Sequence, residues 1–254
     1  MGGTIFIYEL LKKLRLHCHI EIVVQNGSND VLTKFARENL IVHNLNSPST
    51  NVKSFWLAFF RSCNKDAKKV QKIIDSKGFD TIISSMFPAN FIASKLKNVN
   101  IFQYCYEPYA AFWDIVKVNN LNIFKRHATY VLKYIFGRYD IYATRQALKV
   151  FTLSPETKGS ISTTYRLDSL VTYLGVDLNF YRCLVDLSLS KKYKGKQILL
   201  HNTDFSPPKR TGFLLDCMPE IISKVPHIKL LITCSINETK KNKRLVRDIE
   251  LRGM

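Results

Sequence analysis

The sequence predicts an α/β protein built from two doubly wound domains, each a parallel sheet covered by helices. Short apolar runs alternate with amphipathic helical patterns along most of the 254 residues. The series is interrupted at the stretch Leu174 to Leu215 and then restarts with an apolar run, a Pro-bearing loop and a helical pattern. An α/β unit opens in this way. We therefore expect an N-terminal domain at residues 1–178, an interdomain linker at 179–196 and a partial C-terminal domain at 197–254.

The first domain is expected to alternate helices and strands from its beginning. Ile5, Tyr8, Leu11 and Leu14 recur at helical spacing, so a helix should open the chain and end near residue 17. Strands are expected at 20–24, 40–42, 79–84, 100–104, 149–153 and 169–173. Further helices are expected at 31–39, 52–76, 88–96, 123–148 with a break near Gly137, and 155–165. This alternation predicts parallel strands joined by right-handed crossovers.

The second domain shows only two β-α units, at 197–201, 211–224, 228–233 and 238–251. At the other end, Gly2-Gly3 open a helix with no strand before them. In a doubly wound sheet such a loop normally follows the first, central strand. Without that strand its neighbours would leave backbone groups unpaired. We therefore expect a chain truncated at both ends, or one whose start was assigned too late, with the first domain lacking its first strand.

The net charge and the cysteine content indicate which classes of partner and which cellular compartment to expect. The net charge of +18 and the pI of about 9.7 suit an anionic partner, such as nucleic acid, an anionic membrane surface or a phosphorylated small molecule. No nucleic-acid-binding module is recognisable, so no nucleic-acid partner is expected. The six cysteines form no Cys-x-x-Cys pair, and no signal segment or membrane-spanning run is present. These features predict a cytoplasmic protein with reduced thiols.

Five motifs follow one another along the chain. They are Gly2-Gly3-Thr4, Tyr104-Cys105-Tyr106-Glu107-Pro108, Phe151-Thr152-Leu153-Ser154-Pro155-Glu156-Thr157-Lys158, Leu174-Gly175-Val176-Asp177 and Thr203-Asp204-Phe205-Ser206-Pro207-Pro208-Lys209. Each motif alone is weak. In this order and spacing they resemble glycosyltransferase family 4, the glycosyl transferases group 1, over nearly the whole chain.

The resemblance implies a GT-B fold, in which two Rossmann-like domains hold the active site between them. It implies a nucleotide-sugar donor bound mainly by the second domain and an acceptor bound by the first. The reaction would retain anomeric configuration and need neither a metal nor a cofactor. The acceptor would be a lipid-linked or cell-surface glycan, and the protein would work in the cytoplasm, with contact at the cytoplasmic membrane face left open.

Donor-binding roles follow from the resemblance and agree with the residue types. Lys209 and Arg210 precede a helix, whose N-terminal N–H groups and their own charge would stabilise a diphosphate leaving group. Gly2 and Gly3 would let the backbone approach the donor phosphate closely. Ser154 is either a substrate contact or a helix N-cap. The alternatives are a solvated loop lysine at Lys209 and a loosely held terminus at the two glycines.

Catalytic roles fall on Glu107 and Tyr106, at the end of a predicted strand, where α/β enzymes place working groups. The family often has histidine at the position of Tyr106. A tyrosine hydroxyl can donate a hydrogen bond but cannot serve as a base near neutral pH. The alternative for Glu107-Pro108 is a turn or helix-start pair.

Two departures from the family pattern keep a second reading open. Many members carry a Gly-Arg pair where this chain has Thr203-Asp204, and an acidic group there repels a diphosphate unless Arg210 or another cation compensates. The family's two glutamates separated by seven residues are also missing, since no two glutamates here stand eight apart. The alternative is therefore a non-catalytic or split module that needs a partner chain for the donor site.

Other residue clusters are weaker candidates for binding roles. His17-Cys18-His19 has no second ligand cluster, so no metal site is expected. His201, at a strand end, is a packed or solvated histidine or a donor contact. The basic aromatic stretch from Tyr130 to Tyr142 is expected to be core and solvated face, and it leaves a peripheral contact with anionic lipid open.

Overall fold

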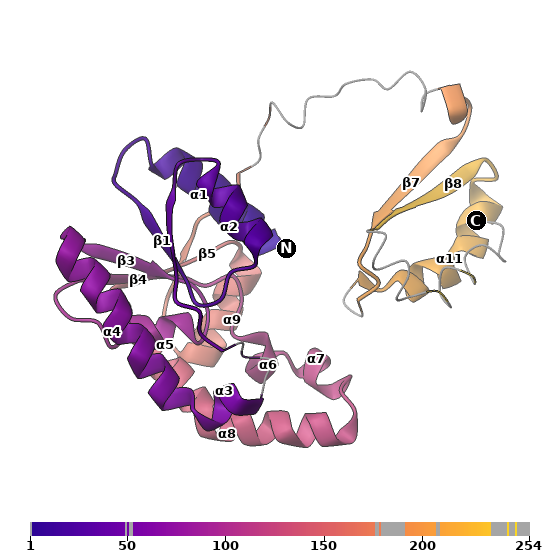
Figure 1. Ribbon diagram of the computed structural model, residues 1–254. Helices are drawn as coiled ribbons and strands as arrows, with labels where there is room; N and C mark the ends of the chain where they lie inside the picture. The colour runs from indigo at the N-terminus through magenta and orange to yellow at the C-terminus, as the bar shows by residue number, and fades with distance from the viewer. Residues whose placement is uncertain are drawn as a thin grey trace. The chain divides into compact units, whose positions relative to one another are not determined.

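The computed structural model describes residues 2–48, 50, 53–175, 178, 191–206, 209–234, 243 and 247. Contacts divide the chain into two compact units, Met1–Gly175 and Val176–Met254 (Figure 1). The predicted boundary at residue 178 stays a prediction. Most of the predicted linker lies outside the described residues, and so does Asp177.

Unit 1 contains two parallel sheets. In the first, β1 (Glu21–Val24) pairs with β2 (Ile41–Asn44). In the second, β3 (Thr81–Ser84), β4 (Asn100–Tyr104), β5 (Lys149–Thr152) and β6 (Leu170–Val171) lie side by side in chain order. All described pairs are parallel, which confirms the predicted α/β class. Among the described strands, β1 and β3 each pair with a single partner.

Helices connect and cover these strands (Figure 1). They are α1 (Gly2–Leu14), α2 (Asn29–Ala36), α3 (Lys53–Leu57), α4 (Phe59–Lys77), α5 (Ala89–Ala93), α6 (Ala110–Trp113), α7 (Ile115–Asn119), α8 (Ile123–Arg145) and α9 (Pro155–Tyr165). The helical region predicted at 52–76 is two helices that meet at Ala58, whose φ of −101° and ψ of 14° lie outside the helical region. The short helices α6 and α7 were not predicted.

The predicted break near Gly137 is wrong, because α8 runs unbroken through that residue. Gly137 is buried, and a Cβ added there would lie 3.4 Å from Cζ2 of Trp113. The glycine therefore sits where α8 packs closely against the Trp113 ring of α6, and neighbouring contacts outweigh its low helix propensity.

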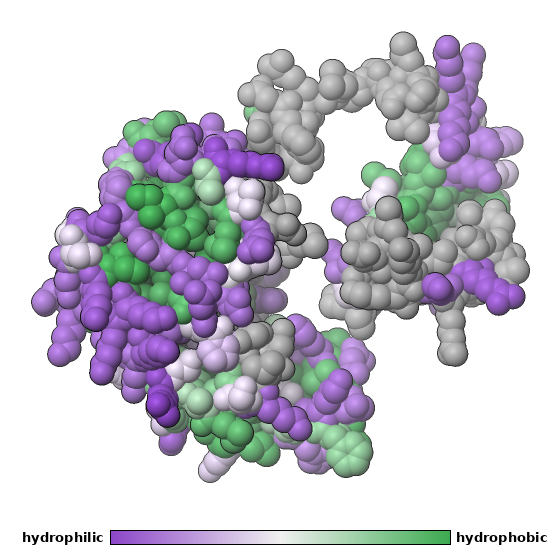
Figure 2. Space-filling model, in the orientation of Figure 1, coloured by the Kyte–Doolittle hydropathy of each residue, from purple (hydrophilic) through white to green (hydrophobic). Residues whose placement is uncertain are grey.

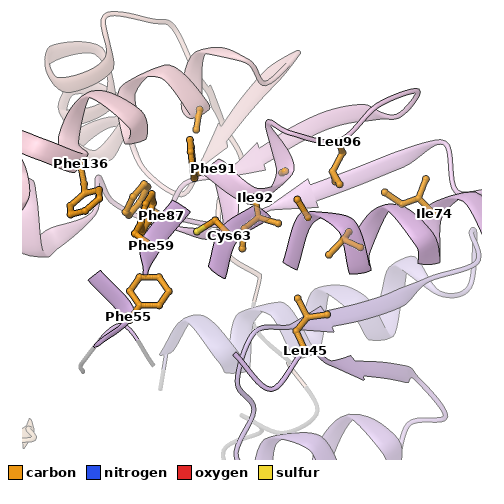
Figure 3. Close-up of a cluster of buried hydrophobic side chains, with 14 of the residues drawn as sticks. Leu45, Phe55, Phe59, Cys63, Ile74, Phe87, Phe91, Ile92, Leu96 and Phe136 are labelled. Carbon is orange, nitrogen blue, oxygen red and sulfur yellow. The ribbon is translucent and has the colours of Figure 1, made fainter. Parts of the chain in front are cut away.

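The main core of unit 1 is aromatic. Phe55, Phe59, Phe87, Phe91 and Phe136 are almost completely buried and come from α3, α4, α5, α8 and the loop before α5 (Figure 3). Ring centroids of Phe59 and Phe136 lie 4.6 Å apart, and those of Phe59 and Phe91 lie 5.2 Å apart. Tilted and offset aromatic pairs of this kind add to the stabilisation from burial itself.

Unit 2 has one described sheet, in which β7 (Gln197–Asn202) pairs in parallel with β8 (Ile228–Thr233). Helix α11 (Thr211–Lys224) connects them and buries Leu215 and Met218 against Leu230 of β8. This is the β-α-β unit predicted at 197–233. The helix predicted at 238–251 lies outside the described residues.

Within the described part of the chain, none of the helices combines the length and apolar character needed to cross a bilayer.

Candidate active site

In unit 1 the predicted site residues follow the carboxyl ends of β4 and β5. These strands are parallel neighbours, with Tyr104 in register with Phe151. The backbone N–H of Cys105 donates to the carbonyl oxygen of Phe151 at 2.8 Å, and Thr152 Oγ1 donates to the carbonyl oxygen of Cys105 at 3.0 Å. The start of the Cys105–Pro108 loop is therefore fixed to the neighbouring strand.

Tyr106 and Glu107 lie in this loop with different exposure. Tyr106 is half-buried, and its ring centroid lies 5.2 Å from that of Tyr104. Burial, and secondarily the Tyr104 phenol, raises the pKa of Tyr106. Its hydroxyl therefore stays protonated near neutral pH and can donate a hydrogen bond but not accept a proton as a base. Glu107 is exposed, and its backbone carbonyl accepts from Cys105 Sγ at 3.3 Å.

A cluster of hydroxyl groups beside this loop was missed by sequence reasoning. Tyr104 OH donates to the carbonyl oxygen of Thr172 at 3.0 Å, and Thr172 Oγ1 lies 3.2 Å from Tyr104 OH. Thr172 follows β6, so these bonds connect β4 to the chain beyond the last strand of its sheet. The sequence feature that could have indicated these hydrogen bonds is the polar residue at the end of each of the two strands.

Ser154 is the N-cap of α9. Its Oγ accepts from the backbone N–H of Thr157 at 3.2 Å, and Pro155 at the first helical position suits a helix start. The structure thus shows the capping role, and the predicted contact with a donor stays a prediction.

Gly2 and Gly3 form the first residues of α1. The first N–H groups of a helix have no partner within it, so these two positions can present backbone donors to an anion. Their predicted approach to a donor phosphate stays a prediction.

In unit 2 the start of α11 is held against the end of β7 by side chains. Thr203 and Thr211 are both buried, and their hydroxyl oxygens lie 2.9 Å apart. His201 Nε2 lies 3.1 Å from Thr211 Oγ1, and the Thr203 N–H donates to the carbonyl oxygen of Thr233 at 3.0 Å. His201 is half-buried and contacts the helix start, and its predicted contact with a donor stays a prediction.

Lys209 and Arg210 are exposed immediately before α11. Arg210 is the N-cap, with a φ of 47°, and its side chain makes no capping hydrogen bond. A guanidinium has no acceptor, so it cannot satisfy the first N–H groups of the helix as serine or aspartate would. The start of α11 thus places two cations next to a helix N-terminus. Because the Arg210 side chain caps none of the first N–H groups, these donors can bind another acceptor. This arrangement suits an anion.

Asp204 lies in the same loop, where its charge was expected to oppose a diphosphate. Its carboxylate accepts from the backbone N–H of Ser206 at 2.9 Å and from the Ser206 hydroxyl. These bonds, together with the Lys209 charge, hold the pKa of Asp204 below its usual value. The carboxylate is ionised and shapes the loop, and Lys209 is a cation that offsets it.

A metal site is not formed by the side chains that the structure describes, since no three His, Cys, Asp or Glu residues among them gather as ligands would. In the His17-Cys18-His19 segment, Cys18 Sγ contacts the Leu14 carbonyl oxygen and His19 Nε2 lies 3.3 Å from a Glu21 oxygen.

The sequence matches no protein-family model and no curated protein sequence. Solved structures are similar in fold. The chain superposes over its full length on HepE from Anabaena, solved in complex with UDP and glucose, with a TM-score of 0.62 and 16% identity. Over 92% of its length it matches a glycosyltransferase from Rickettsia africae, with a TM-score of 0.54 and 16% identity.

A protein from Listeria monocytogenes assigned as a UDP-N-acetylglucosamine 2-epimerase is also similar, over 96% of this chain, with a TM-score of 0.51 and 11% identity. The chain spans 63% to 64% of the length of these three proteins. At these identities the likeness shows the fold. It confirms the predicted GT-B type of α/β protein with Rossmann-like domains, and membership of family 4 stays a prediction.

Proposed function

We propose that the protein is a glycosyltransferase that transfers a sugar from a nucleotide-sugar donor to a glycan acceptor. The observation that carries this proposal is the fold likeness, over the full chain, to a protein solved with UDP and glucose. The start of α11 supports it independently, because Lys209 and Arg210 stand at a helix start whose first N–H groups receive no capping hydrogen bond from the Arg210 side chain. A nucleoside diphosphate is an anion that such a helix start can bind.

Sugar transfer from such a donor develops negative charge on the departing diphosphate. Fixed cations and oriented N–H groups stabilise that charge without having to reorganise during the reaction. We assign this role to Lys209, Arg210 and the first N–H groups of α11. The assignment requires no metal, and the proposed mechanism is metal-independent and retains anomeric configuration.

Acceptor or sugar contacts are proposed for unit 1. Tyr106, held protonated by burial, would donate a hydrogen bond to a sugar hydroxyl. The exposed Glu107 carboxylate would accept one and orient the reacting group. A lipid-linked or cell-surface glycan is the proposed acceptor, used at the cytoplasmic side of the membrane.

One observation favours a second candidate, a non-catalytic or split module that binds the nucleotide sugar and relies on a partner chain for transfer. This chain has Thr203-Asp204 where many members of the family that it resembles carry a Gly-Arg pair, so a donor site here would carry less positive charge. Both candidates predict donor binding. Only the enzyme predicts turnover by this chain.

Release of UDP from UDP-sugars separates the two candidates. We expect the purified chain to release UDP when a lipid-linked glycan acceptor is added, and to do so equally with and without EDTA. Collapse of turnover in EDTA would contradict the metal-free mechanism. Binding of the donor without turnover on any acceptor would favour the non-catalytic module, and absence of both would contradict the proposed function.

A further inference from the structure

Helix α8 carries apolar side chains on two faces. One face packs in the core of unit 1 through Phe136 and Ala143. The other is exposed and consists of Ile123, Phe124, Tyr130, Val131, Tyr134, Ile135 and Tyr142. Ile123 and Tyr130, Phe124 and Val131, and Ile135 and Tyr142 are each seven residues apart, and Tyr134 lies four residues after Tyr130, which places these side chains in one continuous stripe along the helix. Phe124 and Tyr134 are 84% and 88% exposed, so this stripe has no covering within the described chain.

Helix α7 extends the same surface. Ile115 and Val116 are 68% and 66% exposed there, while Val118 is buried in the core. The two helices are linked where Tyr130 OH donates to Asn119 Oδ1 at 3.3 Å. We call the exposed apolar residues of the two helices the α7–α8 surface. In Figure 2 green and purple side chains interleave along the lower edge of the larger unit, over the helices labelled α7 and α8 in Figure 1.

The charge of this region is mainly positive, although the acidic Asp114 caps the start of α7. The basic residues of Ile115–Arg145 are Lys117, Lys125, Arg126, Lys133, Arg138 and Arg145. The acidic residue within that range is Asp140, which is fully buried and accepts hydrogen bonds inside the protein. Lys133 Nζ lies 4.5 Å from the Trp113 ring centroid, which is within cation–π distance.

The exposed apolar side chains and the basic residues together indicate which kind of partner could cover the α7–α8 surface. Large exposed apolar patches mark interaction sites. A second copy of the chain would bring the same positive charge to the contact, which disfavours self-association. A long helix with an apolar stripe, several tyrosines and flanking lysines and arginines instead fits the interface of an anionic bilayer.

We propose that the α7–α8 surface docks on an anionic phospholipid bilayer, with α8 lying in the plane of the interface. The apolar side chains enter the boundary between headgroups and acyl chains, and the lysines and arginines contact lipid phosphates. This proposal does not depend on the proposed sugar transfer, and its test uses binding alone.

Sedimentation with vesicles tests the apolar part of the contact. The full 254-residue chain should bind vesicles of phosphatidylcholine mixed with phosphatidylglycerol more tightly than vesicles of phosphatidylcholine alone. Joint substitution Phe124→Ser and Tyr134→Ser should weaken that binding by about tenfold or more, because two buried aromatic contacts are lost. The matched control is Tyr173→Ser, a 74% exposed aromatic beyond the end of β6, which should bind like the original protein.

Charge reversal tests the electrostatic part. Lys117→Glu with Lys125→Glu should weaken binding to the anionic vesicles by about tenfold or more, and added salt should weaken the binding of the original protein. Lys68→Glu with Lys72→Glu makes the same change of charge on the exposed side of α4 and should have a clearly smaller effect. All substituted side chains are exposed, and circular dichroism should show unchanged helix content.

Other outcomes would overturn the proposal. Equal binding by the α8 double variant and the original protein would place the contact elsewhere. Failure to bind anionic vesicles, together with a dimer that Phe124→Ser and Tyr134→Ser dissociate, would assign the surface to a second copy. Salt-sensitive binding to duplex DNA that the α8 variant loses, without vesicle binding, would assign it to nucleic acid. None of these binding measurements depends on UDP release. A negative result for membrane binding would therefore not contradict the glycosyltransferase proposal, which has a separate test.

Discussion

Lys209 and Asp204 show how single residues set the charge and the conformation of the loop before α11, for which we propose donor binding. The carboxylate of Asp204 is occupied by two hydrogen bonds from Ser206, so it fixes the loop that carries the lysine. Lys209 is exposed, and its backbone N–H donates to the carbonyl oxygen of Ser206 at 2.9 Å. Its side chain therefore supports little of the fold and is available to an anionic ligand.

Replacement of Lys209 by alanine should lower sugar transfer by about 10²-fold, the scale of losing one preorganised stabiliser of transition-state charge. Thermal stability should change little, because the side chain is exposed. The control is Lys224→Ala, an exposed lysine at the other end of α11 that pairs with Glu220. Near-normal UDP release by the Lys209 variant would refute the role proposed for this residue.

At this scale the sequence could predict residue types at strand ends and helix starts but not their partners. Ser154 followed by Pro155 is a local capping signal, and the N-cap alternative proved to be the structural role. The contact between Thr203 and Thr211 depends on how the intervening loop folds back, which composition and periodicity do not encode. The same holds for Tyr104 and Thr172, which are 68 residues apart.

Among the elements, α8 is held in place by a buried carboxylate. Asp140 accepts from Asn90 Nδ2 of α5 at 2.9 Å, Trp113 Nε1 of α6 at 2.8 Å and Tyr165 OH of α9 at 2.9 Å. One side chain thus connects four helices. Replacing a buried acceptor that has three donors should lower the stability of the fold. Each donor that loses its hydrogen-bond partner would stay buried, without the hydrogen bond that offsets its loss of hydration.

Replacement of Asp140 by asparagine should lower the free energy of unfolding by roughly 1–3 kcal/mol, since an amide turns one acceptor of this network into a donor. The effect should depend on pH. Burial raises the pKa of Asp140 above its ordinary value of 3.8, so the folded protein binds this proton more tightly than the unfolded chain. The stability that Asp140 contributes is therefore greatest in acid and declines as pH rises through its folded pKa.

Urea unfolding from about pH 4 to about pH 7 checks this prediction. The difference in stability between the original protein and the Asp140→Asn variant should shrink as pH rises. Asp80→Asn, at an exposed position before β3, removes a carboxylate outside the network and serves as control. A difference that grows with pH would contradict the raised pKa.

Elements with strong local signals were predicted well, and those decided by packing were not. The bounds of β4, α9, α11 and β8 agree with the predicted ranges, because strand-like runs and clear helix starts and ends delimit them. Gly137 misled the prediction for α8, since its place against Trp113 is a tertiary contact. The short helices α6 and α7 carry too few residues for a periodic pattern.

For the whole molecule, the alternation of strands and helices was enough to predict the α/β class with parallel sheets, and the resemblance to glycosyltransferase family 4 implied the GT-B type of fold. The structure divides the chain into two compact units at Gly175, and the predicted domain bounds stay a prediction. The net charge of +18 predicted an anionic partner without identifying it. We propose two distinct regions for such partners, the start of α11 for a nucleotide phosphate and the α7–α8 surface for lipid. Only a folded structure separates them, because lysines and arginines are spread along the entire sequence.

The central claim is that a nucleoside diphosphate binds at the start of α11. Titration of the isotopically labelled chain with UDP, followed by the backbone amide signals of Thr211, Gly212 and Phe213, tests it most directly. We predict saturable shifts concentrated on these three amides and on Lys209, lost in the Lys209→Ala variant. An unchanged spectrum at saturating UDP, or shifts confined to residues away from this helix start, would contradict the account.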